Sequence, residues 1–219
     1  MYVAQRLNAL VQKKKLKKLR TSDNKIIAGL ATNFNIPLSE DPKEMLDRLV
    51  NVVPLTWIAE STEHNEESES LMEYSNENGM IMLRKLHHKQ ELTDTEMQLL
   101  SAITAELKLT PVTDMQFTVF RGINQDLSTI IPGEIILSNG PSSATFSAQI
   151  AADYIGNECC MTEILIPKGS NVTYVDLLDQ LIFPPKSSFR IVSKPFNKSW
   201  YMENNKSYTD ILTIKMELV

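Results

Sequence analysis

The hydrophobic pattern of this 219-residue chain changes near residue 110, and this change restricts the folds that the chain can adopt. Before it, apolar residues recur every three or four positions, which is typical of amphipathic helices. After it come short runs rich in β-branched and aromatic residues, separated by Gly, Pro, Asn and Ser. Helices that precede strands, instead of alternating with them, predict an α+β fold with a helical N-terminal half and a mainly antiparallel or mixed sheet.

The helical half has five predicted segments. Helices are predicted over residues 1–20, 22–34, 39–53, 71–86 and 92–107. The fourth is expected to be interrupted or bent near Gly79. Thr93 and Glu96 have the spacing of a capping box, and Met97 is assigned to the buried face of the helix that follows. We therefore divide the chain into a helical region, residues 1–108, and a β-rich domain, residues 109–219.

Three segments of the β-rich half contain residues suited to binding a phosphorylated ligand. The first, FTVFRG, ends in Arg121 and Gly122. A guanidinium can contact phosphate through two hydrogen bonds, and a glycine lets the backbone approach a ligand. The second, GPSSATFSAQIAADY, is predicted to form a short strand and then a helix capped by Ser147. The third is LLDQLIFPPKSSFRIV, residues 177–192.

In this order, the three segments resemble the ADP-ribosyltransferases of the cholera-toxin-like, Arg-Ser-Glu class. That family has a Ser-Thr-Ser strand, to which Ser143, Ala144 and Thr145 correspond, so Ala144 departs from the pattern. It also has Glu-x-Glu, three apolar residues and Pro-Pro-Gly-Thr-x-Phe. Alignment on the two prolines and Phe189 puts Gln180 at the catalytic glutamate and Leu178 at the upstream one.

The resemblance covers residues 110–219 and implies a two-sheet core that binds bent NAD as substrate. It implies that Arg121, with Gly122, holds the diphosphate or the ribose next to it, and that Ser143 supports the nicotinamide side. Thr145, on the strand that carries Ser143, and Phe189 would complete the NAD site. The layout also resembles small phage-encoded enzymes that transfer a single ADP-ribose to host proteins. A protein acceptor in the host cytoplasm is then expected, and Leu178 weakens the case for arginine as the modified residue.

Gln180 keeps the shape and an acceptor oxygen of glutamate but lacks its charge. Losing one preorganised electrostatic partner typically costs about 10²–10³ in rate, so the sequence predicts NAD binding with little turnover. Gln180 could be a substitution made to trap substrate or the natural residue of a relative that only binds. If instead the alignment is displaced, Asp176, Asp179 or Glu163 would supply the carboxylate. The alternative function is a non-catalytic NAD-binding or structural protein, for instance a virion-associated one.

The charge of the N-terminal segment suggests nucleic acid as a second kind of partner, whereas the composition argues against a metal site and a membrane span. Residues 1–20 carry a net charge of +7, although the whole chain is at −5, so nucleic-acid binding through this segment is a weaker hypothesis. The competing interpretation is a solvated helix face whose apolar side, with Leu7 and Leu10, docks on the protein. The adjacent Cys159 and Cys160 and the three histidines match no metal-ligand spacing. No apolar run is long enough to cross a membrane, so an intracellular location is expected.

Overall fold

The structure is a computed structural model, and it describes residues 7, 10–11, 13–15, 17–34, 36–52, 69–74, 76–109, 112–113, 116–123, 126–153, 155, 160–175, 180–202 and 207–219. The helices are α2 (Thr21–Asn33), α3 (Pro42–Val52), α5 (Glu69–Tyr74), α6 (Glu77–His87), α7 (Asp94–Leu109) and α8 (Ala148–Asp153). The strands are β1 (Phe117–Ile123), β2 (Ile135–Leu137), β3 (Ser142–Ala144), β4 (Cys160–Ile166), β5 (Thr173–Val175), β6 (Gln180–Phe183), β7 (Ser188–Ile191), β8 (Phe196–Met202) and β9 (Ser207–Leu218).

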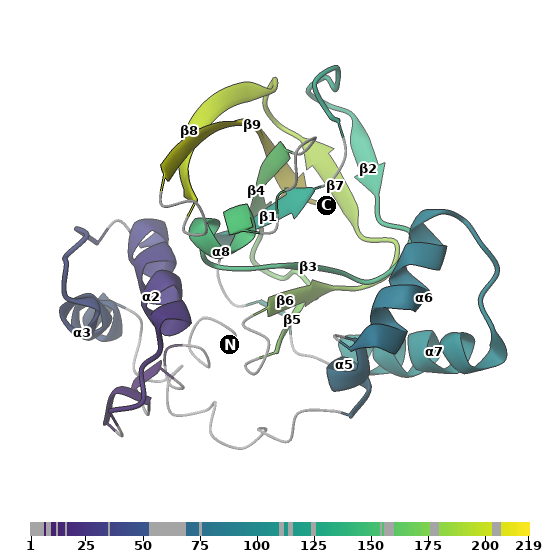
Figure 1. Ribbon diagram of the computed structural model, residues 1–219, viewed down its shortest axis with the longest axis horizontal. Helices are drawn as coiled ribbons and strands as arrows, with labels where there is room; N and C mark the ends of the chain where they lie inside the picture. The colour runs from purple at the N-terminus through teal and green to yellow at the C-terminus, as the bar shows by residue number, and fades with distance from the viewer. Residues whose placement is uncertain are drawn as a thin grey trace.

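The strands form two sheets, as the α+β prediction required. The larger sheet has the order β1-β4-β9-β7-β2, and β8 pairs with β9 outside this path. Its β4–β9 pair is parallel and its other pairs are antiparallel, so the sheet is mixed. The smaller sheet has the order β3-β6-β5 and is antiparallel. Figure 1 shows α2 and α3 on one side of the sheets and α5, α6 and α7 on the other.

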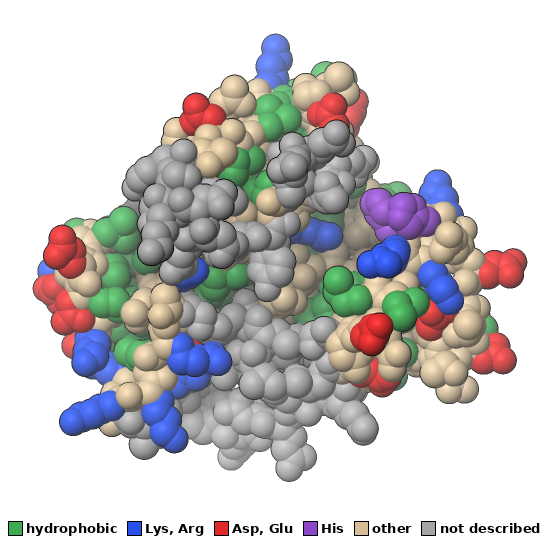
Figure 2. Space-filling view, in the orientation of Figure 1, with side chains coloured by type: hydrophobic (Ala, Val, Ile, Leu, Met, Phe, Trp, Pro, Cys, Tyr) green, Lys and Arg blue, Asp and Glu red, His purple; other side chains and the backbone are tan. Residues whose placement is uncertain are grey.

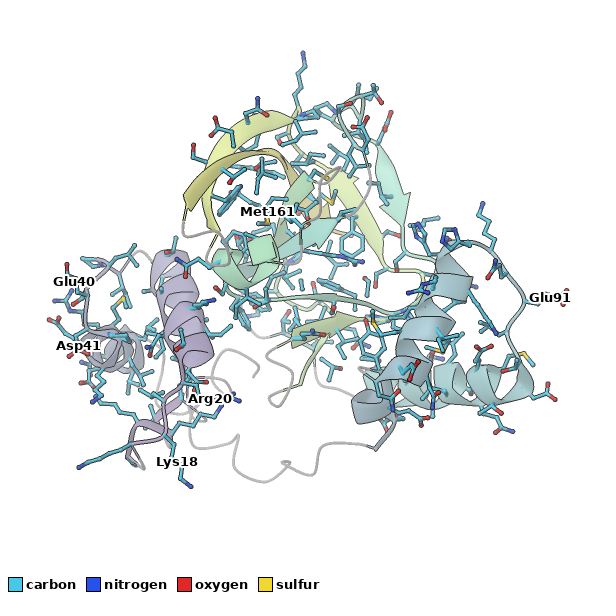
Figure 3. All side chains as sticks on the ribbon, viewed as in Figure 1. Lys18, Arg20, Glu40, Asp41, Glu91 and Met161 are labelled. Atoms are coloured by element: carbon cyan, nitrogen blue, oxygen red, sulfur yellow. The ribbon has the colours of Figure 1, made fainter. Side chains whose placement is uncertain are left out.

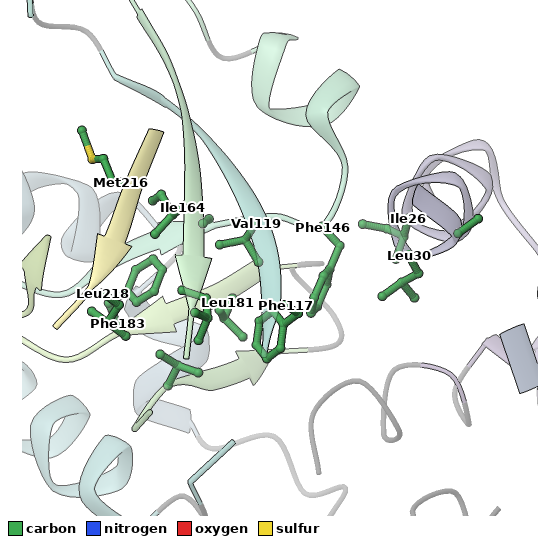
Figure 4. Close-up of a cluster of buried hydrophobic side chains, with 14 of the residues drawn as sticks. Ile26, Leu30, Phe117, Val119, Phe146, Ile164, Leu181, Phe183, Met216 and Leu218 are labelled. Carbon is green, nitrogen blue, oxygen red and sulfur yellow. The ribbon is translucent and has the colours of Figure 1, made fainter. Parts of the chain in front are cut away.

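One hydrophobic core joins the N-terminal helices to both sheets. Ile26 and Leu30 of α2 are fully buried and belong to the same cluster as Phe117, Phe146 and Phe183. Figure 4 shows the two α2 side chains directed toward Phe146. Leu7 and Leu10 are also fully buried in this core, which confirms that the apolar side of the N-terminal segment docks. A second cluster lies between α5, α6, α7 and β6.

The predicted capping box of α7 is confirmed, but one residue of its predicted buried face is exposed. Thr93 Oγ1 accepts a hydrogen bond from Glu96 N at 3.3 Å, and the Glu96 carboxylate accepts from Thr93 N at 2.7 Å. Met97, however, is 50 % exposed, and Leu99 is buried instead. The prediction for Met97 was wrong because α7 packs on α5 and β6, and only the fold fixes that direction of packing.

The helix predicted over residues 71–86 is interrupted, as one of the two alternatives near Gly79 required, because α5 ends at Tyr74 and α6 begins at Glu77. Asn76 caps α6 through its side-chain oxygen, which accepts hydrogen bonds from the backbone nitrogens of Asn78 and Gly79. A Cβ atom at Gly79 would lie 2.1 Å from the Tyr74 carbonyl oxygen. Because Gly79 has no side chain, the start of α6 packs closely against the end of α5. This contact fixes the position of Tyr74.

Candidate active site

The strand pair β3–β6 sets the orientation of two predicted site residues. Ser143 pairs with Ile182 in this antiparallel register, so the two side chains share one face of the small sheet. Gln180 precedes Ile182 by two positions and points to the same face, whereas Leu181 and Phe183 point into the main core. Ile182 is buried against Tyr74 and Met82. The face with Ser143 and Gln180 is thus turned toward α5, α6 and α7.

Arg121 comes from β1, which lies beside the end of β3. Phe120 and Thr145 exchange backbone hydrogen bonds of 2.8 and 2.9 Å across this junction. Successive side chains of a strand point to opposite faces, so Arg121 lies on the same face of β1 as the buried Phe117 and Val119. This face of β1 is directed toward the core. Its carbonyl oxygen accepts a hydrogen bond from the Thr162 hydroxyl at 2.9 Å. The long-range pairing of β1 with β3 and β4 therefore fixes the place of Arg121.

The Arg121 side chain is partly buried. Desolvation lowers the pKa of Arg121, and the neighbouring Tyr74 phenol acts in the opposite direction. Among the residues that the structure describes, no carboxylate forms an ion pair with Arg121. A guanidinium stays protonated even when desolvated, and an uncompensated charge away from water costs free energy. Such a site favours an anionic ligand.

Tyr74, at the end of α5, joins the helical region to this site. Its side chain is 4 % exposed, and its phenol lies close to Ser143 and Arg121. Burial raises the pKa of the Tyr74 phenol, while the nearby Arg121 and the hydrogen bond with Ser143 lower it. Sequence analysis missed this residue, because nothing in the sequence around a helix-ending tyrosine indicates a contact with strands so far along the chain.

The other predicted site residues occupy different positions. The Thr145 hydroxyl accepts a hydrogen bond from Ser147 N at 3.2 Å, and Ser147 caps α8 by accepting from Ile150 N at 3.3 Å. At Gly122, a Cβ atom would lie 2.9 Å from the Ala151 carbonyl oxygen of α8. Gly122 thus has a packing role, on the face of β1 opposite Arg121.

Phe189 and Glu163 lie in two different environments. Phe189 is buried in the main core, with its ring centroid 5.1 Å from that of Phe183. Glu163 pairs with Phe120 and lies on the outer face of the large sheet, where Lys198 Nζ is 2.5 Å from its carboxylate. That face borders a cavity of about 450 Å³ between α2 and β8. Because Arg121 lies on the opposite face of the sheet, the orientation of Glu163 does not suit it to replace the missing carboxylate. Asp176, Leu178 and Asp179 lie outside the described residues, as does Tyr154.

The basic N-terminal segment is held to α2 and α3 by ion pairs. Lys13 Nζ lies 3.1 Å and Arg20 Nε 3.6 Å from the buried carboxylate of Asp23, and Lys14 Nζ lies 2.5 Å from Asp47. Figure 2 shows basic side chains gathered at the lower left of the molecule, where Figure 3 labels Lys18 and Arg20. Part of the +7 charge is therefore compensated within the protein.

The described residues contain no cluster of three His, Cys, Asp or Glu side chains able to hold a metal ion. None of the helices in the described ranges has both the length and the apolar character needed to span a bilayer. Cys160 is a buried free thiol in β4, and its neighbour Cys159 lies outside the described ranges.

The two sheets and their arrangement define the ADP-ribosyltransferase fold. Exoenzyme S from Pseudomonas aeruginosa, solved with human 14-3-3 protein beta and carba-NAD, superposes with a TM-score of 0.51 at 13% identity, over 68% of this chain and 70% of that one. Plx2a, an ADP-ribosyltransferase toxin from Paenibacillus larvae, gives 0.53 at 16% identity, over 73% of this chain and 89% of the toxin. C3larvin toxin from the same organism gives 0.53 at 15% identity, covering 73% and 90%.

No model of a protein family matches the sequence. No curated protein matches it either. The likeness is therefore one of fold, and it confirms the fold expected from the Arg121, Ser143 and Gln180 motifs.

Proposed function

We propose that this protein binds NAD beside Arg121 and on the face of β3 and β6 that carries Ser143 and Gln180. The observation that carries the proposal is the position of Arg121, a partly buried cation of β1 beside Tyr74 that has no carboxylate partner among the described residues. A diphosphate would supply the missing negative charge through bidentate hydrogen bonds. The fold is shared with exoenzyme S, which was solved with carba-NAD, and this supports NAD as the ligand.

The residues present fit this ligand in their chemistry. Arg121 provides the cation, Ser143 a hydroxyl that can donate or accept, and Gln180 an amide at the start of β6. In transfer of ADP-ribose, positive charge develops on the ribose as nicotinamide leaves. Gln180 can accept a hydrogen bond from the ribose but brings no negative charge to that position.

The reaction proposed is transfer of a single ADP-ribose to a protein side chain, at a rate limited by Gln180. A protein of a host cell, modified in its cytoplasm, is the acceptor that the resemblance implies. The helical region, residues 1–108, would take part in recognising it. The competing function is a protein that binds NAD, or keeps the fold for assembly, without turnover, and Gln180 is the observation in its favour.

Binding and turnover can be tested separately. We expect NAD to raise the Tm of the protein and Arg121→Met to abolish that effect. Nicotinamide release should be near background for the unmodified protein and should rise about 10²–10³-fold in Gln180→Glu. NAD stabilisation without release by Gln180→Glu would favour the binding-only function. If NAD neither stabilises nor is cleaved by any of these proteins, the proposal is wrong.

A further inference from the structure

The cavity of about 450 Å³ on the outer face of the large sheet is separate from the proposed NAD site. Its walls come from α2, β1, α8, β4 and β8, on the face of the sheet that carries Glu163 and is opposite to Arg121. At Gly29, a Cβ atom would lie 1.9 Å from the Phe146 carbonyl oxygen, so α2 packs directly against the segment that leads into α8. The packing of the fold therefore forms this cavity, and its volume is within the range of sites that bind small molecules.

Two aromatic side chains form an apolar wall of the cavity. Phe120 of β1 and Trp200 of β8 both line it, with ring centroids 5.9 Å apart and ring planes at 70° to each other. Trp200 Nε1 donates a hydrogen bond to Thr213 Oγ1 at 2.9 Å, which fixes the orientation of the indole. Both rings are partly buried and pack against the buried Met161 and Ala152. This wall presents aromatic surfaces on which another flat ring can pack.

The polar wall of the cavity carries an excess of positive charge. Lys25 of α2 and Lys198 of β8 line it, and Glu163 is the one carboxylate among the described lining residues. Lys198 Nζ lies 2.5 Å and Lys215 Nζ 3.8 Å from the Glu163 carboxylate, so one negative charge faces three ammonium groups. Lys198 Nζ also lies 4.1 Å from the centroid of the Trp200 ring. The ion pair and the indole together hold this cation at the border between the polar and the aromatic wall.

We propose that this cavity binds a nucleoside monophosphate. The base packs against Phe120 and Trp200, because every base has a flat π surface that stacks on aromatic side chains. The phosphate lies at Lys25 and Lys198, since lysine ammonium groups bind phosphate as point charges. The Gln149 amide of α8 also lines the cavity and can both donate and accept hydrogen bonds at the edge of the base. A ligand with both a ring and a negative charge is needed to cover the aromatic wall and compensate the cations. This inference does not rest on the proposed NAD binding.

Calorimetric titration of the full chain with adenosine monophosphate (AMP) tests the site. AMP should bind at least about 10-fold more tightly than adenosine, which lacks the phosphate, and than inorganic phosphate, which lacks the base. Lys198→Met removes the charge at a side chain that is 44 % exposed, and it should weaken AMP binding about 10–100-fold. Lys108→Met is the matched control, since Lys108 is exposed on α7 and does not line this cavity. Absence of AMP binding, adenosine binding as tight as that of AMP, or equal affinity in Lys198→Met overturns the proposal.

Two further variants distinguish this cavity from the proposed NAD site. Arg121→Met should bind AMP as tightly as the unmodified protein, because Arg121 lies on the opposite face of the sheet. Loss of AMP binding in Arg121→Met with unchanged binding in Lys198→Met would locate AMP at the NAD site and overturn the proposal. AMP should also change the tryptophan fluorescence of the unmodified protein, and Trp200→Leu, which keeps Trp57, should lose this response. A response of equal size in Trp200→Leu contradicts the placement of the base. A chain that binds AMP but not NAD would support this site and refute the proposed function alone.

Discussion

Tyr74 of α5 lies close to Ser143 of β3 and to the guanidinium of Arg121, so a residue of the helical region forms part of the candidate NAD site. The three side chains come from elements far apart in the sequence. The tyrosine is 4 % exposed and is packed with Ile182 of β6. The position of α5 is thereby coupled to the face that presents Ser143 and Gln180.

The raised pKa of Tyr74 predicts how stability depends on alkaline pH. Above about pH 10 the phenol ionises in the unfolded chain but stays protonated in the folded one. Its contribution is therefore complete below about pH 10 and is lost as the pH rises toward the folded-state pKa. Urea unfolding between pH 7 and pH 11 should show a smaller alkaline loss in Tyr74→Phe. Ser143→Ala keeps the phenol and should retain the loss, and the same loss in Tyr74→Phe would contradict the prediction.

Replacement of Arg121 should separate stability from ligand binding. Arg121→Met removes a partly buried cation that has no carboxylate partner among the described residues, so the ligand-free protein should be at least as stable as the original. The affinity for NAD should fall about 10–100-fold, which corresponds to loss of charged hydrogen bonds of about 1.5–3 kcal/mol. Calorimetric titration with NAD measures this change. Arg190→Met, at a half-exposed arginine of β7, should leave NAD affinity unaltered, and a strongly destabilised Arg121→Met would show that the arginine is structural.

Replacement of Gly122 should lower the stability of the fold more than the affinity for NAD. The Cβ atom of Gly122→Ala would lie 2.7 Å from Ile155 Cγ1 and 2.9 Å from the backbone oxygen of Ala151. Overpacking of this kind typically costs about 1–3 kcal/mol, which denaturant unfolding would detect. NAD affinity of the folded fraction should be unchanged. A large loss of affinity at unchanged stability would instead assign Gly122 to ligand approach.

The junction of α6 and α7 should weaken in acid. The Lys85 ammonium, 2.8 Å away, and the Thr93 backbone and side chain hold the pKa of Glu96 below its ordinary value. This contribution is present above about pH 4.3 and is lost as the pH falls through the folded-state pKa of Glu96. Glu96→Gln should lower the Tm at pH 7 and flatten its decline between pH 5 and pH 3. Glu91→Gln, at an exposed position of the same connection, serves as control. An unaltered decline in Glu96→Gln would refute the assignment.

Thr93→Ala tests the same cap without changing the charge. Removal of an N-cap hydroxyl costs about 0.5–2 kcal/mol of stability. The loss should show in urea unfolding at pH 7. If Thr93→Ala is as stable as the original, Glu96 alone maintains the start of α7.

The local features of this protein could be read from its sequence. The capping box of Thr93 and Glu96 and the cap of Ser147 involve residues three positions apart, and short-range hydrogen bonding decides them. The resemblance of the motifs around Arg121, Ser143 and Gln180 to the Arg-Ser-Glu class also predicted the fold that the solved toxins share. The short strand β2 was not predicted, since three residues contain too little alternation to indicate a strand.

Long-range packing decided the rest. The sequence determined that Gln180 begins a strand, but the pairing of Ser143 with Ile182 decided that its face meets the helices. It determined a break near Gly79, but the contact of α5 with β6 decided that Tyr74 reaches Ser143. Hydrogen bonding between near neighbours specifies caps and turns, whereas strand register and helix direction depend on which apolar surfaces meet, and only the folded chain brings those surfaces together.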